Sequence, residues 1–297
     1  MPGPVEITRR DIEVSGGTLA CFDLGHAAGD RIAVALHGIT STSRAWLPVA
    51  RGLADRTRLV ALDLRGRGHS RELPGPYGMD AHVRDVLAVL DALGLPRAVL
   101  VGHSLGAYIV ARVGAQHPDR VRSLILVDGG LAIPGVENID LDAFLGPALA
   151  RLKLRFPDQE AYRAWWRQHP ALADADVLDA DLCAYSDYDL IGEPPNLRST
   201  VVEDAVAGDA ADLLKDGDSA HALELPARLL CAPRGLQNGP DPMQPLDLAR
   251  AWAAEQPDRR EALLVPDVNH YTITLGTRGA AAVADAIAAT TAAHTSL

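Results

Sequence analysis

Short runs of strand-forming residues alternate with segments of helical periodicity along most of this chain. The segments between the runs carry apolar residues at spacings of three and four, as in "DAHVRDVLAVLDALG" and "GAYIVARVGAQH". Strands that alternate with helices in this way form a parallel sheet with crossover helices. We therefore expect an α/β fold whose strands are residues 11–14, 18–23, 31–36, 58–62, 98–101, 123–127, 227–231 and 261–265.

The alternation stops between Leu131 and Glu224. This stretch contains no strand-like run, and helical patterns such as "LDAFLGPALARLKL" and "EAYRAWWRQH" replace it. We expect residues 131–224 to form an all-helical cap, inserted into a core domain made of residues 1–130 and 225–297. Seven of the thirteen aromatic residues of the chain lie in the expected cap: Phe144, Phe156, Tyr162, Trp165, Trp166, Tyr185 and Tyr188.

The acidic residues are concentrated in the same segment. The net charge of the chain is −11, and residues 131–224 contain 19 Asp and Glu against 7 Lys and Arg, a balance of −12. The rest of the chain contains 20 acidic against 21 basic residues, a balance of +1. A field of this sign repels nucleic acids and other polyanions, and no basic stripe offsets it. We expect no nucleic-acid partner.

Composition and cysteine content indicate a cytoplasmic protein. Apolar residues make up 48% of the chain, but no stretch approaches the roughly 18 uninterrupted apolar residues that a membrane helix needs. The first residues, "MPGPVEITRRD", are charged and lack the apolar centre of a secretory signal. Cys21, Cys183 and Cys231 are an odd number without metal-site spacing, which is typical of free thiols in a reducing compartment.

A serine lies where one expected strand becomes a helix. The segment "AVLVGHSLGAYIVA" contains a GxSxG motif, with Ser104 between Gly102 and Gly106. In such a motif the serine occupies a strained turn between strand and helix, and the glycines keep side chains out of a crowded neighbourhood. The pattern favours Ser104 as a nucleophile over a plain glycine-rich connection.

A serine hydroxyl needs a general base that takes its proton. His270 follows the last expected strand, "EALLVPDV", and one asparagine, so a short loop brings it to the carboxyl edge of the sheet. His103 is next to Ser104 in sequence, but neighbouring side chains on a tight turn point apart. We expect His270 to be the base.

Acyl transfer also places negative charge on the substrate oxygen, which backbone N–H groups can stabilise. The strand 31–36 runs into His37-Gly38-Ile39, where a glycine lets the backbone bend and present the amide of Ile39. Leu105 follows the nucleophile at a helix N-terminus and offers a second amide. We expect Ile39 and Leu105 to form an oxyanion hole and His37 to contact the substrate.

These motifs together resemble the α/β-hydrolase superfamily. They are the His37-Gly38 loop, the segment "DLRGRGHS" at residues 63–70, the turn at Ser104 and the late Asn269-His270 pair. The resemblance extends over nearly the whole chain and reaches esterase-like and lactonase-like members only at superfamily level. It implies an eight-stranded, mostly parallel sheet with a helical cap inserted after strand six. Asp63 and Arg65 of the segment 63–70 are expected to be structural.

The chain departs from the usual pattern of the superfamily in the acid of the catalytic triad. Most members carry this aspartate after strand seven, but here that position falls near Gly235, and Asp241 would need a loop several residues longer. A variant of the family places the acid after strand six, where this chain has Asp128. Ser104 and Asp128 would then follow neighbouring strands about 4.8 Å apart. The resemblance implies Asp128 as the acid, with Asp241 as the alternative.

The function expected from these residues is hydrolysis of a carboxylic ester or lactone through an acyl-enzyme. Epoxide hydrolases and haloalkane dehalogenases of this superfamily use an aspartate nucleophile, so the serine at position 104 disfavours these two activities. Carbon–carbon bond hydrolysis, and a receptor function without turnover, stay open. No metal or organic cofactor is expected, because the sequence contains neither GxGxxG nor HExxH. The substrate is expected to be a neutral, largely apolar small molecule, and the sequence does not indicate an oligomeric state. Four cap aromatics could line its pocket or form the cap's own core: Tyr162, Trp165, Trp166 and Tyr185.

Overall fold

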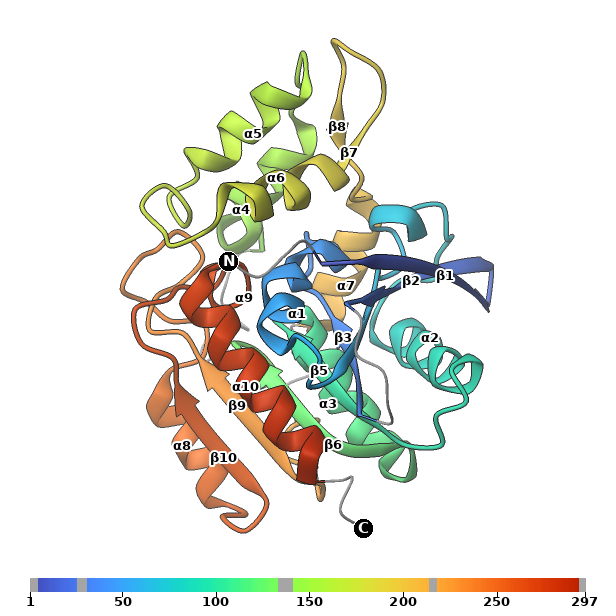
Figure 1. The fold of residues 1–297 in the computed structure, drawn as a ribbon, viewed down its shortest axis with the longest axis vertical. Coiled ribbons are helices and arrows are strands. Elements are labelled where there is room, and N and C mark those ends of the chain that lie inside the picture. Colours follow the sequence, from blue (N-terminus) through green and yellow to red (C-terminus); the bar gives the residue numbers. More distant parts are fainter. Residues whose placement is uncertain (1–4, 26–30, 133–140, 214–217, 294–297) are drawn as a thin grey trace.

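An eight-stranded sheet forms the centre of the protein (Figure 1). The computed structural model describes residues 5–25, 31–132, 141–213 and 218–293. The strands lie in the order β1-β2-β4-β3-β5-β6-β9-β10. β1 and β2 are antiparallel to each other, β2 is antiparallel to β4, and the remaining neighbours are parallel. The strands are β1 (Ile7–Val14), β2 (Gly17–Leu24), β3 (Ile32–Leu36), β4 (Arg58–Leu62), β5 (Ala98–His103), β6 (Val121–Val127), β9 (Ala227–Cys231) and β10 (Arg260–Leu264).

Helices cover both faces of the sheet. The α-helices are α1 (Leu47–Leu53), α2 (Met79–Ala92), α3 (Leu105–Gln116), α4 (Leu141–Lys153), α5 (Gln159–Arg167), α6 (Asp179–Tyr188), α7 (Glu203–Leu213), α8 (Leu246–Ala254), α9 (Thr272–Leu275) and α10 (Thr277–Ala293). The described residues also form the short 3₁₀ helices η1 (Ser43–Trp46), η2 (Gly68–Ser70) and η3 (Pro118–Arg120). Apolar side chains of α2, α3 and α8 pack on one face, and those of α1 and α10 pack on the other. The two buried faces explain why the central strands are apolar throughout rather than alternating.

All eight expected strands are present, so the predicted eight-stranded, mostly parallel sheet is confirmed. The expectation of an all-helical insertion is wrong in one detail. Between β6 and β9 the chain forms α4 to α7 and also a small antiparallel pair, β7 (Leu190–Ile191) with β8 (Arg198–Ser199). Strands of two residues are too short to show the alternation that identifies a strand in a sequence.

The inserted segment is attached to the rest of the protein by partly buried polar contacts. The carboxylate of Asp181 on α6 pairs with Arg51 on α1, and the hydroxyl of Tyr188 donates to Asp63 after β4. At its far end, Ala220 and Leu223 are fully buried in the same apolar cluster as α2, α3 and α8. Residues at the end of the expected cap range therefore pack with the core sheet.

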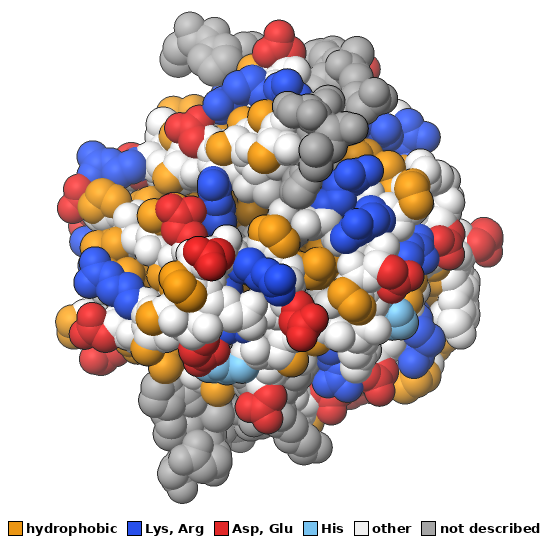
Figure 2. Space-filling view, turned by 90° about the horizontal axis from the view of Figure 1, so that it is seen from below, with side chains coloured by type: hydrophobic (Ala, Val, Ile, Leu, Met, Phe, Trp, Pro, Cys, Tyr) orange, Lys and Arg blue, Asp and Glu red, His pale blue; other side chains and the backbone are white. Residues whose placement is uncertain are grey.

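Acidic and basic side chains are mixed on the face of the molecule that is turned away from the inserted segment (Figure 2). Apolar side chains lie between them as small separate groups, as on the surface of most globular proteins. Among the helices that the structure describes, none is both long and apolar enough to cross a bilayer.

Candidate active site

Ser104 lies on a sharp turn between β5 and α3. Its backbone has φ 53° and ψ −121°, in the left-handed half of conformational space that a non-glycine residue rarely adopts. A Cβ atom on Gly102 would lie 2.1 Å from the carbonyl oxygen of Gly106, and one on Gly106 would lie 2.2 Å from that of Leu36. Both positions therefore require glycine, because the backbone of the turn passes too close for any side chain. A strained residue of this kind is typical of functional sites.

Asp128 occupies the equivalent place on the neighbouring strand. His103 and Val127, the last residues of β5 and β6, are partners in the parallel register, so Ser104 and Asp128 both follow a paired strand end. The amide of Ser104 donates to the carbonyl of Val127 at 3.0 Å, and the amide of Asp128 donates to that of Leu230 at 2.8 Å. The ladder hydrogen bonds thus fix both backbones at the carboxyl edge of the sheet, where such sites form.

His270 meets Asp128 from the loop after β10. Its Nδ1 atom lies 2.7 Å from Oδ2 of Asp128, and both side chains are buried. The other carboxylate oxygen, Oδ1, accepts a hydrogen bond from the amide of Ala232 at 3.0 Å. A carboxylate in this position fixes the ring tautomer, leaving the Nε2 atom of His270 as the proton acceptor.

The loop that carries His270 is held on both sides. The amide of His270 donates to the carbonyl of Arg234 at 3.1 Å. The preceding residue, Asn269, accepts from the amides of Tyr271 and Thr272 and donates to the carbonyl of Ala171 at 2.8 Å. Asn269 therefore satisfies the first amides of α9 and anchors the loop to the inserted segment.

One pocket contains all five residues expected to carry the chemistry. Ser104, His270, Asp128, Ile39 and Leu105 line it together. The other residues that line it are mostly apolar or uncharged: Gly38, Thr40, Ser41, Ala45, His103, Tyr108, Ala148, Tyr185, Leu213, Leu236, Met243, Gln244, Tyr271, Thr274 and Leu275. None of these described residues is a lysine or an arginine.

His37 does not lie in the pocket wall, which corrects the expectation that it contacts the substrate. Its side chain is fully buried, with Nδ1 2.8 Å from the carbonyl oxygen of Gly38 and Nε2 accepting from the amide of Leu64 at 3.0 Å. Burial lowers the pKa of His37 to about 4, so the ring is neutral near pH 7. Both ring nitrogens are occupied within the protein, and His37 supports the Gly38 loop from behind.

One of the four aromatic residues considered for the pocket lines it, and the other three do not. Tyr185 lines the pocket, and its hydroxyl lies 3.3 Å from Oγ of Ser41. Tyr162 and Trp166 are buried in an apolar cluster behind the pocket wall, which also contains Tyr185, Ala45 and Leu275, and Trp165 packs against that cluster. Of the two possibilities that the sequence leaves open for Tyr162, Trp165 and Trp166, lining of the pocket is therefore wrong, because these rings fill the apolar cluster behind its wall.

The alternative acid, Asp241, is exposed, and the aspartate that meets His270 is Asp128. The polar pocket residues that sequence reasoning missed include Tyr108, Gln244 and Tyr271. Tyr108 had a usable signal, since it lies four residues after Ser104 on the same face of α3. Its hydroxyl donates to the carbonyl of Leu131 at 2.6 Å.

His103 packs against the base without sharing its role. The two rings have centroids 4.7 Å apart, and Nε2 of His103 donates to the backbone carbonyl of His270 at 2.9 Å. Burial and the neighbouring His270 hold the pKa of His103 well below its usual value, so this ring is neutral.

Asp63 and Arg65 have structural contacts, as their sequence context predicts. Asp63 accepts from the amides of Ser43 and His69, both at 2.8 Å, and Arg65 forms a buried ion pair with Asp85 at 2.7 Å. Among the described residues, no group of three or more His, Cys, Asp or Glu side chains is arranged to hold a metal ion.

Comparison with known proteins agrees with this geometry. Residues 34–180 match the family model of the alpha/beta hydrolase fold. The chain is 38% identical over 104 residues to RutD of Caulobacter segnis, which is provisionally named a carbamate hydrolase, covering 34% of this chain and 39% of that protein. It is 33% identical over 162 residues to Lipase LipV of Mycobacterium tuberculosis, covering 52% of this chain and 57% of the lipase. Each match spans less than two thirds of the relative's own length.

Solved structures match over a larger part of the chain. The crystal structure of E-2-(acetamidomethylene)succinate hydrolase superposes with a TM-score of 0.77 at 22% identity, covering 95% of this chain and 98% of that one. The thioesterase domain from the curacin biosynthetic pathway gives a TM-score of 0.72 at 18% identity, covering 95% and 99%. The sheet order, the turn at Ser104 and these matches lead to one conclusion: the chain is a member of the α/β-hydrolase superfamily.

Proposed function

We propose that the protein is a serine hydrolase that cleaves a carboxylic ester or lactone through an acyl-enzyme. The observation that carries the proposal is the contact of His270 with Asp128, in the pocket that Ser104 also lines. A nucleophile, a base and a group that orients the base are the parts that this chemistry needs.

Each residue has a defined step. Oγ of Ser104 attacks the carbonyl carbon while Nε2 of His270 takes its proton, and the amides of Ile39 and Leu105 hydrogen-bond the oxygen that becomes negative. Asp128 stabilises the imidazolium. The bond to the leaving alkoxide then breaks as His270 returns the proton to it. Water attacks the acyl-enzyme by the same route, releasing the acid and restoring Ser104.

The pocket wall supports a neutral substrate. Its described lining is mainly leucine, isoleucine, methionine, alanine and tyrosine, and its charged side chain is Asp128, which pairs with His270. A buried carboxylate on the substrate would find no cationic partner among these residues, so its desolvation would go uncompensated. We therefore propose an uncharged, largely apolar ester or lactone rather than the dicarboxylate in the name of the succinate hydrolase.

A pre-steady-state assay with p-nitrophenyl butyrate tests the proposal. The wild type should release a burst of nitrophenolate equal to the enzyme concentration, because acylation by this activated ester is faster than hydrolysis of the acyl-enzyme. The Ser104→Ala variant should show neither burst nor turnover. The control is Ser186→Ala, which removes a buried serine hydroxyl of α6 outside the pocket and should leave the burst intact.

Two results would contradict the proposal in different ways. Turnover of a vinylogous diketone with no reaction of any ester would indicate carbon–carbon bond hydrolysis at the same triad. Thermal stabilisation by small lactones without any hydrolysis would indicate a receptor.

A further inference from the structure

The loop between β3 and η1 is held by three buried side chains, one for each successive carbonyl. The carbonyl of Gly38 accepts from Nδ1 of His37, and that of Ile39 accepts from Nε of Arg67 at 3.0 Å. The carbonyl of Thr40 accepts from Nη2 of Arg151 at 2.7 Å. These contacts surround the amide of Ile39, which the proposed mechanism uses as an oxyanion donor.

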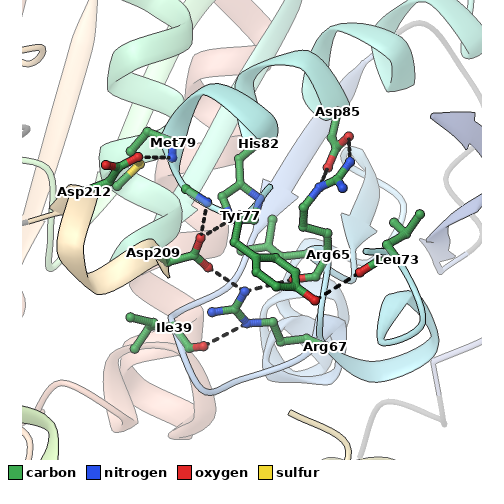
Figure 3. Close-up of polar contacts among 12 residues, drawn as sticks. Ile39, Arg65, Arg67, Leu73, Tyr77, Met79, His82, Asp85, Asp209 and Asp212 are labelled. Carbon is green, nitrogen blue, oxygen red and sulfur yellow. Dashed lines mark hydrogen bonds and ion pairs between the residues drawn. The ribbon is translucent and has the colours of Figure 1, made fainter. Parts of the chain in front are cut away.

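Arg67 is anchored by the inserted segment. Its guanidinium is fully buried and pairs at 2.5 Å with Asp209 of α7, which is also fully buried (Figure 3). Asp209 in turn lies 3.0 Å from Nε2 of His82 and accepts from the amide of Gly78 at 2.8 Å, both at the start of α2. The same guanidinium therefore connects α7 and α2 to the carbonyl of Ile39.

Arg151 approaches the loop from α4, within the inserted segment. Its Nη1 atom lies 2.5 Å from both Asp189 and the hydroxyl of Tyr162. The side chain is 2% exposed, and Asp189 also accepts from the hydroxyls of Ser199 and Thr200. Each arginine is thus paired with a buried carboxylate, which offsets the cost of burying its charge.

The geometry of the peptide unit links these contacts to catalysis. A carbonyl and the following amide lie in one plane, so fixing the carbonyl of Gly38 fixes the direction of the Ile39 amide. That direction also depends on the backbone torsions of Ile39 and Thr40. Arg67 and Arg151 restrain these torsions by binding the carbonyls of the two residues. An oxyanion hole works because its donors are already oriented when the charge develops. The planar fork of arginine can hold a carbonyl and a carboxylate at fixed angles at once, which lysine cannot do.

We infer that Arg67 and Arg151 are positioning residues for the oxyanion hole, and that the inserted segment sets the catalytic rate through them as well as covering the pocket. This inference rests on the proposed function, because it assigns a role to the Ile39 amide. It is not a consequence of the superfamily fold alone, since the anchoring carboxylates, Asp209 and Asp189, both lie in the inserted segment.

The chain offers a matched control two residues from Arg67. Arg65 forms a buried ion pair with Asp85 in which both side chains are 4% exposed, and its other contacts are the carbonyls of Pro74 and Ser15. Figure 3 shows the two pairs side by side along α2. Removing either pair as a unit avoids leaving an unpaired buried charge. The comparison is therefore between Arg67→Met/Asp209→Asn and Arg65→Met/Asp85→Asn.

Two measurements test the inference. One is steady-state kinetics on p-nitrophenyl butyrate, and the other is the affinity of a boronic acid that mimics the tetrahedral intermediate. Arg67→Met/Asp209→Asn should lower kcat by about 10- to 100-fold with KM within about threefold, because a misplaced donor weakens only the transition state. The boronic acid should bind more weakly by a similar factor. Arg65→Met/Asp85→Asn should keep kcat within about threefold at a similar loss of thermal stability.

Equal losses of kcat in the two double variants, or none in the Arg67 variant, would overturn the inference. If the double variant does not fold, Arg67→Lys keeps the cation beside Asp209 but loses the fork to Ile39, and the same kcat and boronic-acid criteria apply. Failure of the proposed function itself is distinguishable, since then the wild type would show no turnover that depends on Ser104.

Discussion

The Nδ1 atom of His270 lies 2.7 Å from Oδ2 of Asp128, so the carboxylate that orients the base follows β6 rather than β9. Changing Asp128 to asparagine should lower kcat by about 10³- to 10⁴-fold, because the amide can no longer hold the correct ring tautomer. Asp241→Asn should change kcat by less than about twofold. Parallel pH–rate profiles of the two variants check this prediction. A collapse of activity in Asp241→Asn would show that the triad acid follows β9 and is not Asp128.

The buried histidines should make the protein less stable at acidic pH. The folded-state pKa of His37 is lowered by burial from 6.5 to about 4, so the unfolded chain binds a proton between these values that the folded protein does not. The free energy of unfolding therefore rises with pH across this window and falls on acidification, by up to about 2 to 3 kcal/mol from His37 at pH 4.5. Burial shifts His103 in the same direction.

Urea unfolding of the wild type and His37→Gln at pH 7 and pH 4.5 measures this effect. The variant should be less stable at pH 7, because the carbonyl of Gly38 loses its buried donor, but should lose less stability on acidification. An equal loss of unfolding free energy between pH 7 and pH 4.5 in both proteins would show that folding does not lower the pKa of His37.

The turn at Ser104 should not tolerate a methyl group on its glycines. In Gly106→Ala the new Cβ atom would lie 2.2 Å from the carbonyl oxygen of Leu36, a backbone atom that cannot move without shifting β3. We expect a loss of about 3 kcal/mol in the free energy of unfolding, together with loss of activity.

Gly146→Ala in α4 is the control, since a Cβ atom there meets no atom of the described residues within 4 Å, its chain neighbours left aside. Alanine is more favourable than glycine in a helix by about 1 kcal/mol, while the following Pro147 disfavours a helical residue that carries a Cβ atom, so the free energy of unfolding of this variant should change by less than about 1 kcal/mol. Similar thermal denaturation midpoints for Gly106→Ala and the wild type would contradict the close approach at the turn.

The enzyme should hydrolyse a neutral ester more efficiently than an anionic ester of equal chain length. We expect kcat/KM for p-nitrophenyl butyrate to exceed that for mono-p-nitrophenyl succinate by at least about 10-fold, because the described pocket wall offers no cation. Met243→Lys should bring the two kcat/KM values closer together, because the lysine supplies a cation in the pocket wall. A wild type that prefers the succinate ester would require a cationic partner outside the described residues.

The sequence predicts the sheet well because each strand is a separate apolar run between turn residues. It also predicts the edge where Ser104, Asp128 and His270 meet, since the carboxyl ends of parallel strands lie together. It does not predict which way His37 points, because neighbours along a chain say nothing of the hydrogen bonds that burial imposes. For a similar reason it does not decide whether Trp165 and Trp166 line the pocket, since an aromatic residue on an amphipathic helix gives the same pattern whether it faces a ligand or an apolar core.

The contacts of Arg67 and Arg151 could not be read from the sequence at all. Their carboxylate partners are 142 and 38 residues away along the chain, among many other acidic residues of the insertion. Only the three-dimensional packing of α4 and α7 on the β3 loop selects these pairs.

Intact-mass spectrometry after exposure to a fluorophosphonate probe tests the central claim most directly, because the probe phosphonylates only a serine whose hydroxyl is activated by a base. We predict one adduct per chain on Ser104, formed much more slowly in His270→Ala and absent in Ser104→Ala. A wild type that stays unmodified, or an adduct that persists at another residue when Ser104 is replaced, would contradict the account.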